Sequence, residues 1–169
     1  DALKRITDFA AALCDAPIAL VSLVDAERQS FLARTGLDTS STPRSQSFCA
    51  FAMRGEDIMI VADATQDPRF ADNPLVTGEP HIRFYAGAPL LSEEGIPLGS
   101  LCVIDTRPRA GLTDLQRMGL MTLADNVMAR LRDSRDAAAW RATENDVRRE
   151  LSDTEDKFRT LADAMPQMV

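Results

Sequence analysis

The chain has 169 residues, of which 45% are hydrophobic and 27% are charged, a composition suited to one folded core with an appended segment. Acidic residues outnumber basic residues by 26 to 19, so the formal net charge is −7. This balance argues against nucleic acid and anionic membrane surfaces as partners, because both attract basic proteins. The apolar runs also fall far short of the ~20 residues that a membrane-spanning helix needs.

Three cysteines and a single histidine limit the chemistry that the chain can support. Cys14, Cys49 and Cys102 are widely spaced and odd in number, which argues against a disulfide framework and, with only His81 beside them, against a metal site. Free thiols are typical of reducing compartments, and no signal peptide precedes the first helical pattern. We therefore expect a cytoplasmic location and no bound metal.

The first third of the chain predicts one helix and two strands. Apolar residues at helical spacing predict a helix over residues 3–13. Residues 18–24 are apolar on both alternating faces, which is typical of a central strand covered on each side. A turn at residues 25–27 leads to a second strand over 29–35, and the polar residues 38–44 predict a loop.

The middle of the chain predicts short elements separated by irregular backbone. Ser45 or Ser47 can cap a short helix, and a strand follows over 58–61. Two more strands, over 83–91 and 96–104, are joined by a polar turn that contains glycine. Because hairpins rather than strand-helix-strand units join these strands, the sequence predicts an α+β fold with a central antiparallel β-sheet flanked by helices.

The last third predicts a long C-terminal linker helix. Thr113 and Gln116 fit a capping box, in which each side chain binds a free backbone amide of the first turn. Residues 120–165 contain neither glycine nor proline, so one helix can continue to Phe158. More than half of residues 132–159 are charged, which indicates a solvated helix that needs a partner.

An imperfect heptad pattern on this helix predicts coiled-coil pairing. Leu120, Ala124 and Val127 form an earlier apolar stripe that we expect to pack on the folded core. Further residues are expected along the dimer and linker seam: Leu131, Trp140, Val147, Leu151 and Phe158. The pattern favours a parallel homodimer, and a single solvated helix is the alternative.

Five separate segments together resemble bacterial GAF domains, in matching order and spacing over roughly residues 3–131. They read PIALVSLVD at 17–25, SFCA at 47–50, DPRFADNPL at 67–75, RFYAGAPL at 83–90 and GSLCVID at 99–105. The resemblance implies a central antiparallel sheet with helices on one face that form a dimer bundle. It also implies a small-molecule pocket on the opposite face.

A second resemblance concerns the end of the chain, where KFRTLADAMPQMV at 157–169 is similar to the opening of a PAS domain. The implied division is a GAF domain over 1–131, a coiled-coil-like signalling helix over 132–157 and a truncated PAS domain over 158–169. Proteins that resemble this arrangement are often sensor histidine kinases and sometimes cyclic di-GMP enzymes. The expected partners are a second copy of the chain and the downstream PAS and output domains.

Three chemistries of the GAF family call for residues that this chain does not combine. Bilin attachment uses a cysteine followed by a histidine, whereas His81 follows Pro80, so no bilin is expected. Reduction of free methionine sulfoxide needs a second reactive cysteine, and the matching segment HIRF at 81–84 has none. The acidic and asparagine-bearing signature of nucleotide-binding GAF domains is not evident. With no Ser-His-Asp set and no phosphate-binding loop either, we assign no catalytic residue and expect no cofactor.

A candidate ligand site combines the irregular middle region with the start of the strand at 83–91. Its residues would provide donors for an unidentified small anionic or polar molecule: Cys49, Arg69, Asn73, Arg83 and Tyr85. The alternative for Arg69 and Arg83 is that each pairs with a nearby carboxylate and holds the loop in place. The acidic residues available for such pairing are Asp63, Asp67 and Asp72.

Three functional interpretations remain open at this point. The first is a non-catalytic sensory and dimerisation module of a signalling protein, which transmits a change at the pocket through its C-terminal helix. The second is a dimerisation spacer without a ligand, whose pocket is filled by its own side chains. The third is a thiol-based redox sensor or enzyme centred on Cys49, although Cys49 and Cys102 also fit the role of small buried apolar residues.

Overall fold

The structure, a computed structural model, describes residues 1–135 and residue 149. The chain divides into two units, residues 1–129 and residues 130–169. Several expectations lie outside the described residues: the PAS-like segment and the linker positions Trp140, Val147, Leu151 and Phe158. Within the part of the chain that the structure describes, no helix combines the length and apolar character needed to cross a membrane.

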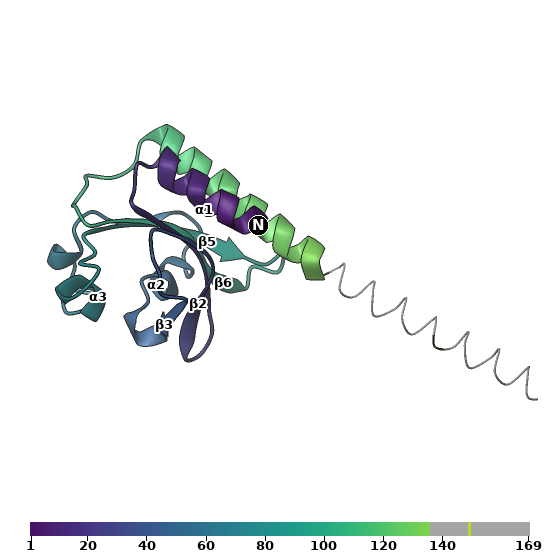
Figure 1. The fold of residues 1–169 in the computed structure, drawn as a ribbon, viewed down its shortest axis with the longest axis horizontal. Coiled ribbons are helices and arrows are strands. Elements are labelled where there is room, and N and C mark those ends of the chain that lie inside the picture. Colours follow the sequence, from purple (N-terminus) through teal and green to yellow (C-terminus); the bar gives the residue numbers. More distant parts are fainter. Residues whose placement is uncertain (136–148, 150–169) are drawn as a thin grey trace, which may run out of the picture. The chain divides into compact units, whose positions relative to one another are not determined.

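The first unit is built on a six-stranded sheet in which every neighbouring pair is antiparallel (Figure 1). The strand order is β3-β2-β1-β6-β5-β4. The strands are β1 (Ile18–Val24), β2 (Arg28–Thr35), β3 (Ser41–Pro43), β4 (Met59–Val61), β5 (Phe84–Leu91) and β6 (Pro97–Asp105). The predicted antiparallel sheet is therefore confirmed, with both hairpins in place.

Helices cover both faces of this sheet (Figure 1). On one face, α1 (Ala2–Leu13) lies beside the C-terminal helix, of which residues 114–129 belong to the first unit. Gln116 Nε2 donates a hydrogen bond to the Leu13 carbonyl over 3.3 Å, which joins the two helices. The opposite face carries α2 (Cys49–Ala52) and α3 (Pro74–Thr77), and the short 3-10 turns η1 (Arg44–Gln46) and η2 (Ala64–Gln66) precede them in the chain.

The central strand owes its apolar character to this double cover. All residues of β1 from Ile18 to Ser22 are buried, as are those of β5 from Phe84 to Leu90. Strands with helices on both faces have no solvated side, so polar residues do not alternate with apolar ones along them. The prediction of a central strand at 18–24 is confirmed.

Side-chain caps begin the helices where the sequence placed them. The Thr113 amide donates to Gln116 Oε1 over 2.9 Å, and the Gln116 amide donates to Thr113 Oγ1 over 3.1 Å, so the capping box is present. At α2, Ser47 Oγ accepts from the Ala50 amide over 3.0 Å. Of the two candidate serines, Ser47 is therefore the one that bonds the first turn of α2, although Phe48 is the residue directly before the helix.

One strand was not expected from the sequence. The polar segment 38–44, predicted as a loop, contains β3, which pairs with the beginning of β2 at the edge of the sheet. Its three residues are too few to show an alternating pattern, and Pro43 is compatible with an edge strand because one side of that strand makes no ladder. The prediction of an irregular loop was wrong for these residues.

A β-bulge in β2 decides which side chains face which layer. Leu32 is an extra residue opposite the junction of Val21 and Ser22 of β1. A bulge of this kind shifts the alternation by one residue. Phe31 consequently lines a cavity on the α2 side, whereas Thr35 donates to Thr7 of α1 over 2.9 Å on the other side.

Candidate functional site

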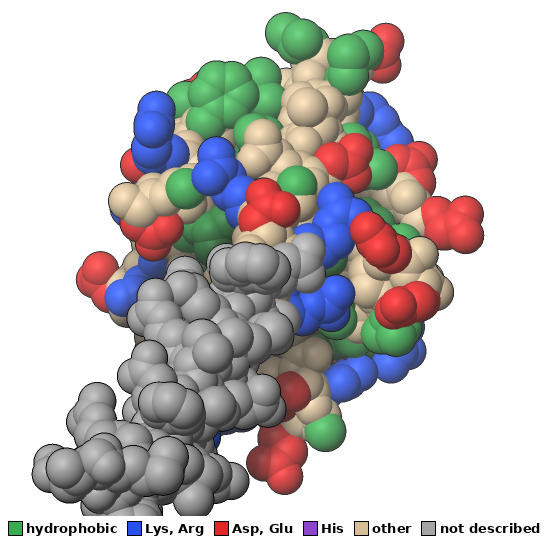
Figure 2. All heavy atoms as spheres, turned by 90° about the vertical axis from the view of Figure 1, so that its right-hand side faces the viewer, with side chains coloured by type: hydrophobic (Ala, Val, Ile, Leu, Met, Phe, Trp, Pro, Cys, Tyr) green, Lys and Arg blue, Asp and Glu red, His purple; other side chains and the backbone are tan. Residues whose placement is uncertain are grey.

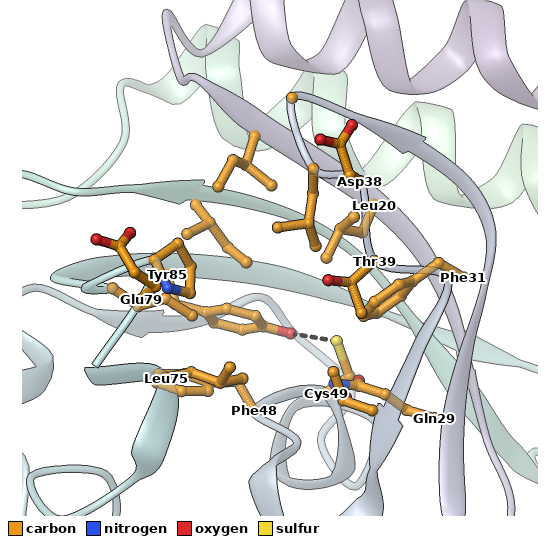
Figure 3. Close-up of a pocket in the computed structure, with 17 residues that line it drawn as sticks. Leu20, Gln29, Phe31, Asp38, Thr39, Phe48, Cys49, Leu75, Glu79 and Tyr85 are labelled. Carbon is orange, nitrogen blue, oxygen red and sulfur yellow. Dashed lines mark hydrogen bonds between the residues drawn. The ribbon is translucent and has the colours of Figure 1, made fainter. Parts of the chain in front are cut away.

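A cavity of about 350 Å³ lies between the sheet and the segments that carry α2 and α3 (Figure 3). Four apolar residues of β1, β2 and β6 contribute to its sheet wall: Ile18, Leu20, Phe31 and Ile104. Phe48, just before α2, and Leu75 of α3 contribute to the opposite wall. Ligand pockets span about 300–1,000 Å³, so this cavity has room for a small organic molecule.

Aromatic stacking holds the wall that contains Phe48. The rings of Phe48 and Phe70 are nearly parallel, with their centroids 4.0 Å apart and their planes inclined by 7°. Phe48 also lies 5.2 Å from the ring of Tyr85, and all three side chains are buried. These contacts among side chains of the chain itself fix the position of the Phe48 ring in the cavity wall.

Gln29 of β2 organises a buried polar network beside the cavity. Its Oε1 accepts hydrogen bonds from Ser22 Oγ over 3.0 Å and from Ser47 Oγ over 2.7 Å. Its Nε2 donates to Thr42 Oγ1 over 2.7 Å. All four side chains are buried, so water does not reach them and they satisfy one another's hydrogen bonds. Gln29 and Thr42 also line the cavity and offer polar groups to its contents.

A second polar cluster joins β5, β6 and α2. The Tyr85 hydroxyl lies 3.1 Å from Cys49 Sγ and 2.9 Å from Ser100 Oγ. Cys49 Sγ lies 3.9 Å from Cys102 Sγ. Cys49 is 3% exposed and points into the cavity (Figure 3). Cys102 is completely buried. The sulfur of Cys49 is therefore the reactive group that a molecule in the cavity meets.

The two thiols differ in acidity because their surroundings differ. The hydrogen bond with Cys102, followed by those with Ser100, Tyr85 and Ser22, lowers the pKa of Cys49 to about 7 against the opposing effect of burial. Burial first, and then the hydrogen bond and negative charge of Cys49, raise the pKa of Cys102 well above its ordinary value. Cys49 is thus the thiol that ionises near neutral pH.

The exposed part of the cavity is acidic. Asp38 and Glu79 contribute to its lining, both are exposed, and their carboxylates are visible in Figure 3. Of the described residues that line the cavity, none is lysine or arginine. This charge distribution favours a neutral or cationic molecule and disfavours a phosphate or other anion.

Two of the five residues predicted at the ligand site, Cys49 and Tyr85, line the cavity, and the other three have different contacts. Arg69 pairs with Asp67 over 2.8 Å and lies 5.0 Å from the centroid of the Phe70 ring. The Arg69 guanidinium holds the pKa of the Asp67 carboxyl below its ordinary value through their hydrogen bonds. Arg69 therefore follows the alternative in which it holds the loop in place.

Asn73 and Arg83 also hold the backbone in place. Asn73 caps α3 by accepting from the Leu75 amide over 2.9 Å, and its amide group donates to the Gln46 carbonyl over 3.2 Å. Arg83 Nη1 donates to the carbonyls of Val76 over 2.9 Å and of Ile82 over 3.0 Å. These bonds explain why donor-rich residues of this region do not reach the cavity.

Four residues of the site are not predicted from the sequence. Gln29 was assigned to a strand, and a polar residue among apolar neighbours on one face was the signal that could have singled it out. Asp38 and Glu79 lie in connecting segments whose approach depends on tertiary structure. The pairing of Cys102 with Cys49 depends on α2 lying over β6, which no spacing in the sequence encodes.

No metal site is evident among the described residues, and the face drawn in Figure 2 carries charges of both signs. No group of three or more histidine, cysteine, aspartate or glutamate side chains there is placed to hold a metal ion. On the face drawn in Figure 2, basic side chains lie among acidic ones and form no continuous basic area over the described residues. The cavity is therefore the candidate functional site.

Comparisons with known proteins agree with this geometry. The chain is 52% identical over 131 residues to a cyclic di-GMP phosphodiesterase of Pseudomonas aeruginosa, a match that covers 78% of this chain and 22% of the relative. The chain thus spans only about a fifth of that relative's length.

Solved structures with the same fold are more distant in sequence. The GAF domain of a phosphoenolpyruvate-protein phosphotransferase from Coxiella burnetii has a TM-score of 0.67 at 19% identity, over 82% of this chain and 84% of that one. A free methionine-R-sulfoxide reductase from Neisseria meningitidis has a TM-score of 0.61 at 20% identity, over 81% of each chain. The GAF domain family matches residues 1–131, and the chain therefore belongs to the GAF family.

Proposed function

We propose that this chain is a non-catalytic sensory and dimerisation module of a multidomain signalling protein. In this proposal a small molecule occupies the cavity and changes the packing of the helices on the other face of the sheet. The C-terminal helix passes that change to downstream domains. Only a molecule with different affinity for two helix arrangements can shift the equilibrium between them.

The observation that carries the proposal is the position of the cavity and the helices on opposite faces of one sheet. β6 contacts both sides, because Cys102 and Ile104 belong to the core beside the cavity, whereas the alternating residues Leu101 and Val103 are buried on the other face. A displacement of β6 at the cavity therefore reaches the layer of α1, which packs against β6.

The expected ligand is a small neutral or cationic organic molecule. Apolar walls would cover its hydrocarbon part, Gln29 and Thr42 would bind a polar group, and Asp38 or Glu79 would attract a positive charge. A cyclic nucleotide is disfavoured because its phosphate would meet carboxylates and no basic side chain of the lining. The ligand-free spacer is the competing proposal.

The helical face supports the dimer proposal. Phe9 of α1 is 56% exposed, and Leu115 and Met118 of the C-terminal helix are 68% and 66% exposed. Large exposed apolar side chains are enriched at protein interfaces. A parallel homodimer would bury them and bring the two C-terminal helices to the output domains together. The linker over 132–157 and the PAS start over 158–169 belong to the same proposal.

For the output we propose an enzyme of cyclic di-GMP turnover in the cytoplasm. The 52% identical relative is named a cyclic di-GMP phosphodiesterase, which favours this class over the histidine kinase expected from the sequence resemblance. The three buried free cysteines are compatible with a reducing compartment.

Light scattering tests the dimer. The wild-type chain is expected to have the mass of a dimer at high micromolar concentration, and Met118→Lys should shift it toward a monomer because a charge would enter the apolar interface. Thr77→Lys, at an exposed position of α3 on the opposite face of the sheet, is the control. A wild-type monomer, or equal effects of both variants, would contradict the proposed interface.

Native mass spectrometry of freshly purified protein tests the ligand. Retained small molecule appears as a defined increment above the chain mass that is lost on denaturation. Leu75→Trp places a larger side chain at the cavity wall and should abolish the increment, whereas Ile96→Trp, at a site 53% exposed and outside the cavity lining, should keep it. An increment that persists in Leu75→Trp would place the molecule elsewhere.

A further inference from the structure

Two buried thiols face each other across the boundary between α2 and the sheet. Cys49 Sγ lies 3.9 Å from Cys102 Sγ, and no chain segment separates the two atoms. The residues are far apart in sequence and lie on different elements, α2 and β6. A disulfide needs the sulfur atoms at about 2.05 Å, so the two sulfur atoms must approach each other through rotation of their side chains or a shift of α2.

The two thiols are not equivalent, and their difference gives each a role. Cys49 lines the cavity, which connects its sulfur to solvent, whereas Cys102 is completely buried behind it. A small oxidant therefore reaches Cys49 first. The pKa of Cys49 is lowered to about 7 by its hydrogen bond with Cys102 and then by the neighbouring hydroxyls, so thiolate is available at neutral pH.

We propose that Cys49 and Cys102 form a reversible intramolecular dithiol switch, in which a small hydroperoxide oxidises Cys49 and Cys102 resolves it to a disulfide. This inference goes beyond the ligand proposal and does not depend on it. The reaction uses the same cavity as an entry path but requires no bound regulator.

The chemistry has two balanced steps. The Cys49 thiolate attacks one oxygen of the hydroperoxide, so an S–O bond forms, the O–O bond breaks, and the leaving oxygen takes up the proton that Cys49 had released and departs as alcohol or water. The Cys102 sulfur then attacks the sulfenic sulfur of Cys49, so an S–S bond forms and the S–O bond breaks. The hydroxyl leaves with the Cys102 proton as water. Two thiols are oxidised, and the hydroperoxide is reduced by two electrons.

The disulfide would change the fold at a sensitive place. It would fix α2 to β6, the strand that contacts the cavity on one face and packs against α1 on the other. The hydrogen bond from Tyr85 to Cys49 would also have to adjust, since the sulfur moves toward Cys102. Oxidation would therefore reach the same helix layer that the proposed ligand acts on.

The test is oxidation of the folded wild-type chain with hydrogen peroxide, followed by acid quenching, alkylation of free thiols and peptide mass spectrometry without reductant. We expect the Cys49 and Cys102 peptides to become joined within one chain, with the loss of both thiols at equal rates and full reversal by dithiothreitol. Cys14 provides an internal control, because it is completely buried and burial raises the pKa of its thiol. Its oxidation should be at least ~10-fold slower.

Two variants separate the steps. Cys102→Ser should leave Cys49 as a sulfenic acid that dimedone traps, and Cys14→Ser should form the same disulfide as wild type. If Cys102→Ser does not fold, the joined peptide of the wild-type chain alone still decides the matter.

The proposal is overturned if both thiols survive the treatment, if Cys14 reacts as fast as Cys49, or if the disulfide joins different chains. A failed disulfide leaves the mass increment of a retained ligand unaffected, so the two proposals fail separately.

Discussion

The hydroxyl of Tyr85 donates a hydrogen bond to the sulfur of Cys49 over 3.1 Å, and both side chains line the same cavity (Figure 3). Tyr85 comes from β5 and Cys49 from α2, so this contact ties a central part of the sheet to the layer that closes the cavity. Ser100 of β6, 2.9 Å from the same hydroxyl, extends the connection to the next strand. A molecule in the cavity and helix α2 would therefore both lie next to the buried hydroxyl group of Tyr85.

This relationship predicts the pH dependence of Cys49 alkylation. Since the pKa of Cys49 is lowered to about 7, the thiolate fraction and the iodoacetamide rate should rise between about pH 6 and pH 8 and level off above. Tyr85→Phe removes one of the hydrogen bonds that lower this pKa, so the midpoint of the rate profile should move to higher pH. The rates are measured by quenching the alkylation at set times and quantifying the modified peptides by mass spectrometry. Cys14 is the slow reference because burial raises the pKa of its thiol. A profile that Tyr85→Phe leaves unchanged would refute the assignment.

Removal of the Gln29 side chain from its polar network is expected to destabilise the fold strongly. Gln29→Leu keeps the approximate volume but leaves the buried hydroxyls of Ser22, Ser47 and Thr42 without their partner. Each buried polar group left unpaired costs about 1–3 kcal/mol, so the free energy of unfolding should fall by at least that amount. Urea unfolding followed by circular dichroism measures the change. Gln66→Leu alters an exposed glutamine in η2 and serves as the control, expected within about 0.5 kcal/mol of wild type.

A side chain at Gly99 is expected to lower the stability of the fold, because the backbone of the neighbouring strand lies too close. A Cβ atom at Gly99 of β6 would lie 1.8 Å from the carbonyl oxygen of Ser22 in β1, whereas a Cβ at Gly111 would meet nothing within 4 Å. The backbone of a central strand cannot yield as a flexible side chain can, so Gly99→Ala should lower the free energy of unfolding by at least about 2 kcal/mol. Gly111→Ala should stay within about 1 kcal/mol of wild type. If the two variants unfold at the same urea concentration, the close approach of β1 and β6 is contradicted.

The fold was largely predictable because its signals are local. The run at 18–24, the capping box of Thr113 and Gln116, and the glycine-containing turn before β6 each depend on residues close in sequence. β3 and the bulge at Leu32 escaped prediction, because an edge strand of three residues and an extra residue leave no periodic pattern. These two features nevertheless place Thr42 and Phe31 at the cavity.

The candidate site was less predictable than the fold. Cys49 and Tyr85 line the cavity, as the sequence predicts. The prediction for the two arginines rests on their charge, and charge alone does not determine which partner lies nearest. Arg69 has a carboxylate two residues away, and Arg83 has backbone carbonyls within reach, so local pairing satisfies both. Asp38 and Glu79, which give the cavity its acidic character, belong to segments brought together only by the folded sheet.

The central claim is that the cavity accepts a neutral or cationic ligand. A thermal-shift titration with panels of small metabolites tests this claim most directly. A ligand that binds only the folded state should raise the Tm, by about 2–4 °C for each kcal/mol of binding stabilisation in a chain of this size. We predict that one or more neutral or amine-bearing compounds raise the Tm of the wild-type chain and of Ile96→Trp, while Leu75→Trp shows no shift. Stabilisation by cyclic nucleotides or other anions alone, or shifts that Leu75→Trp retains in full, would contradict the account.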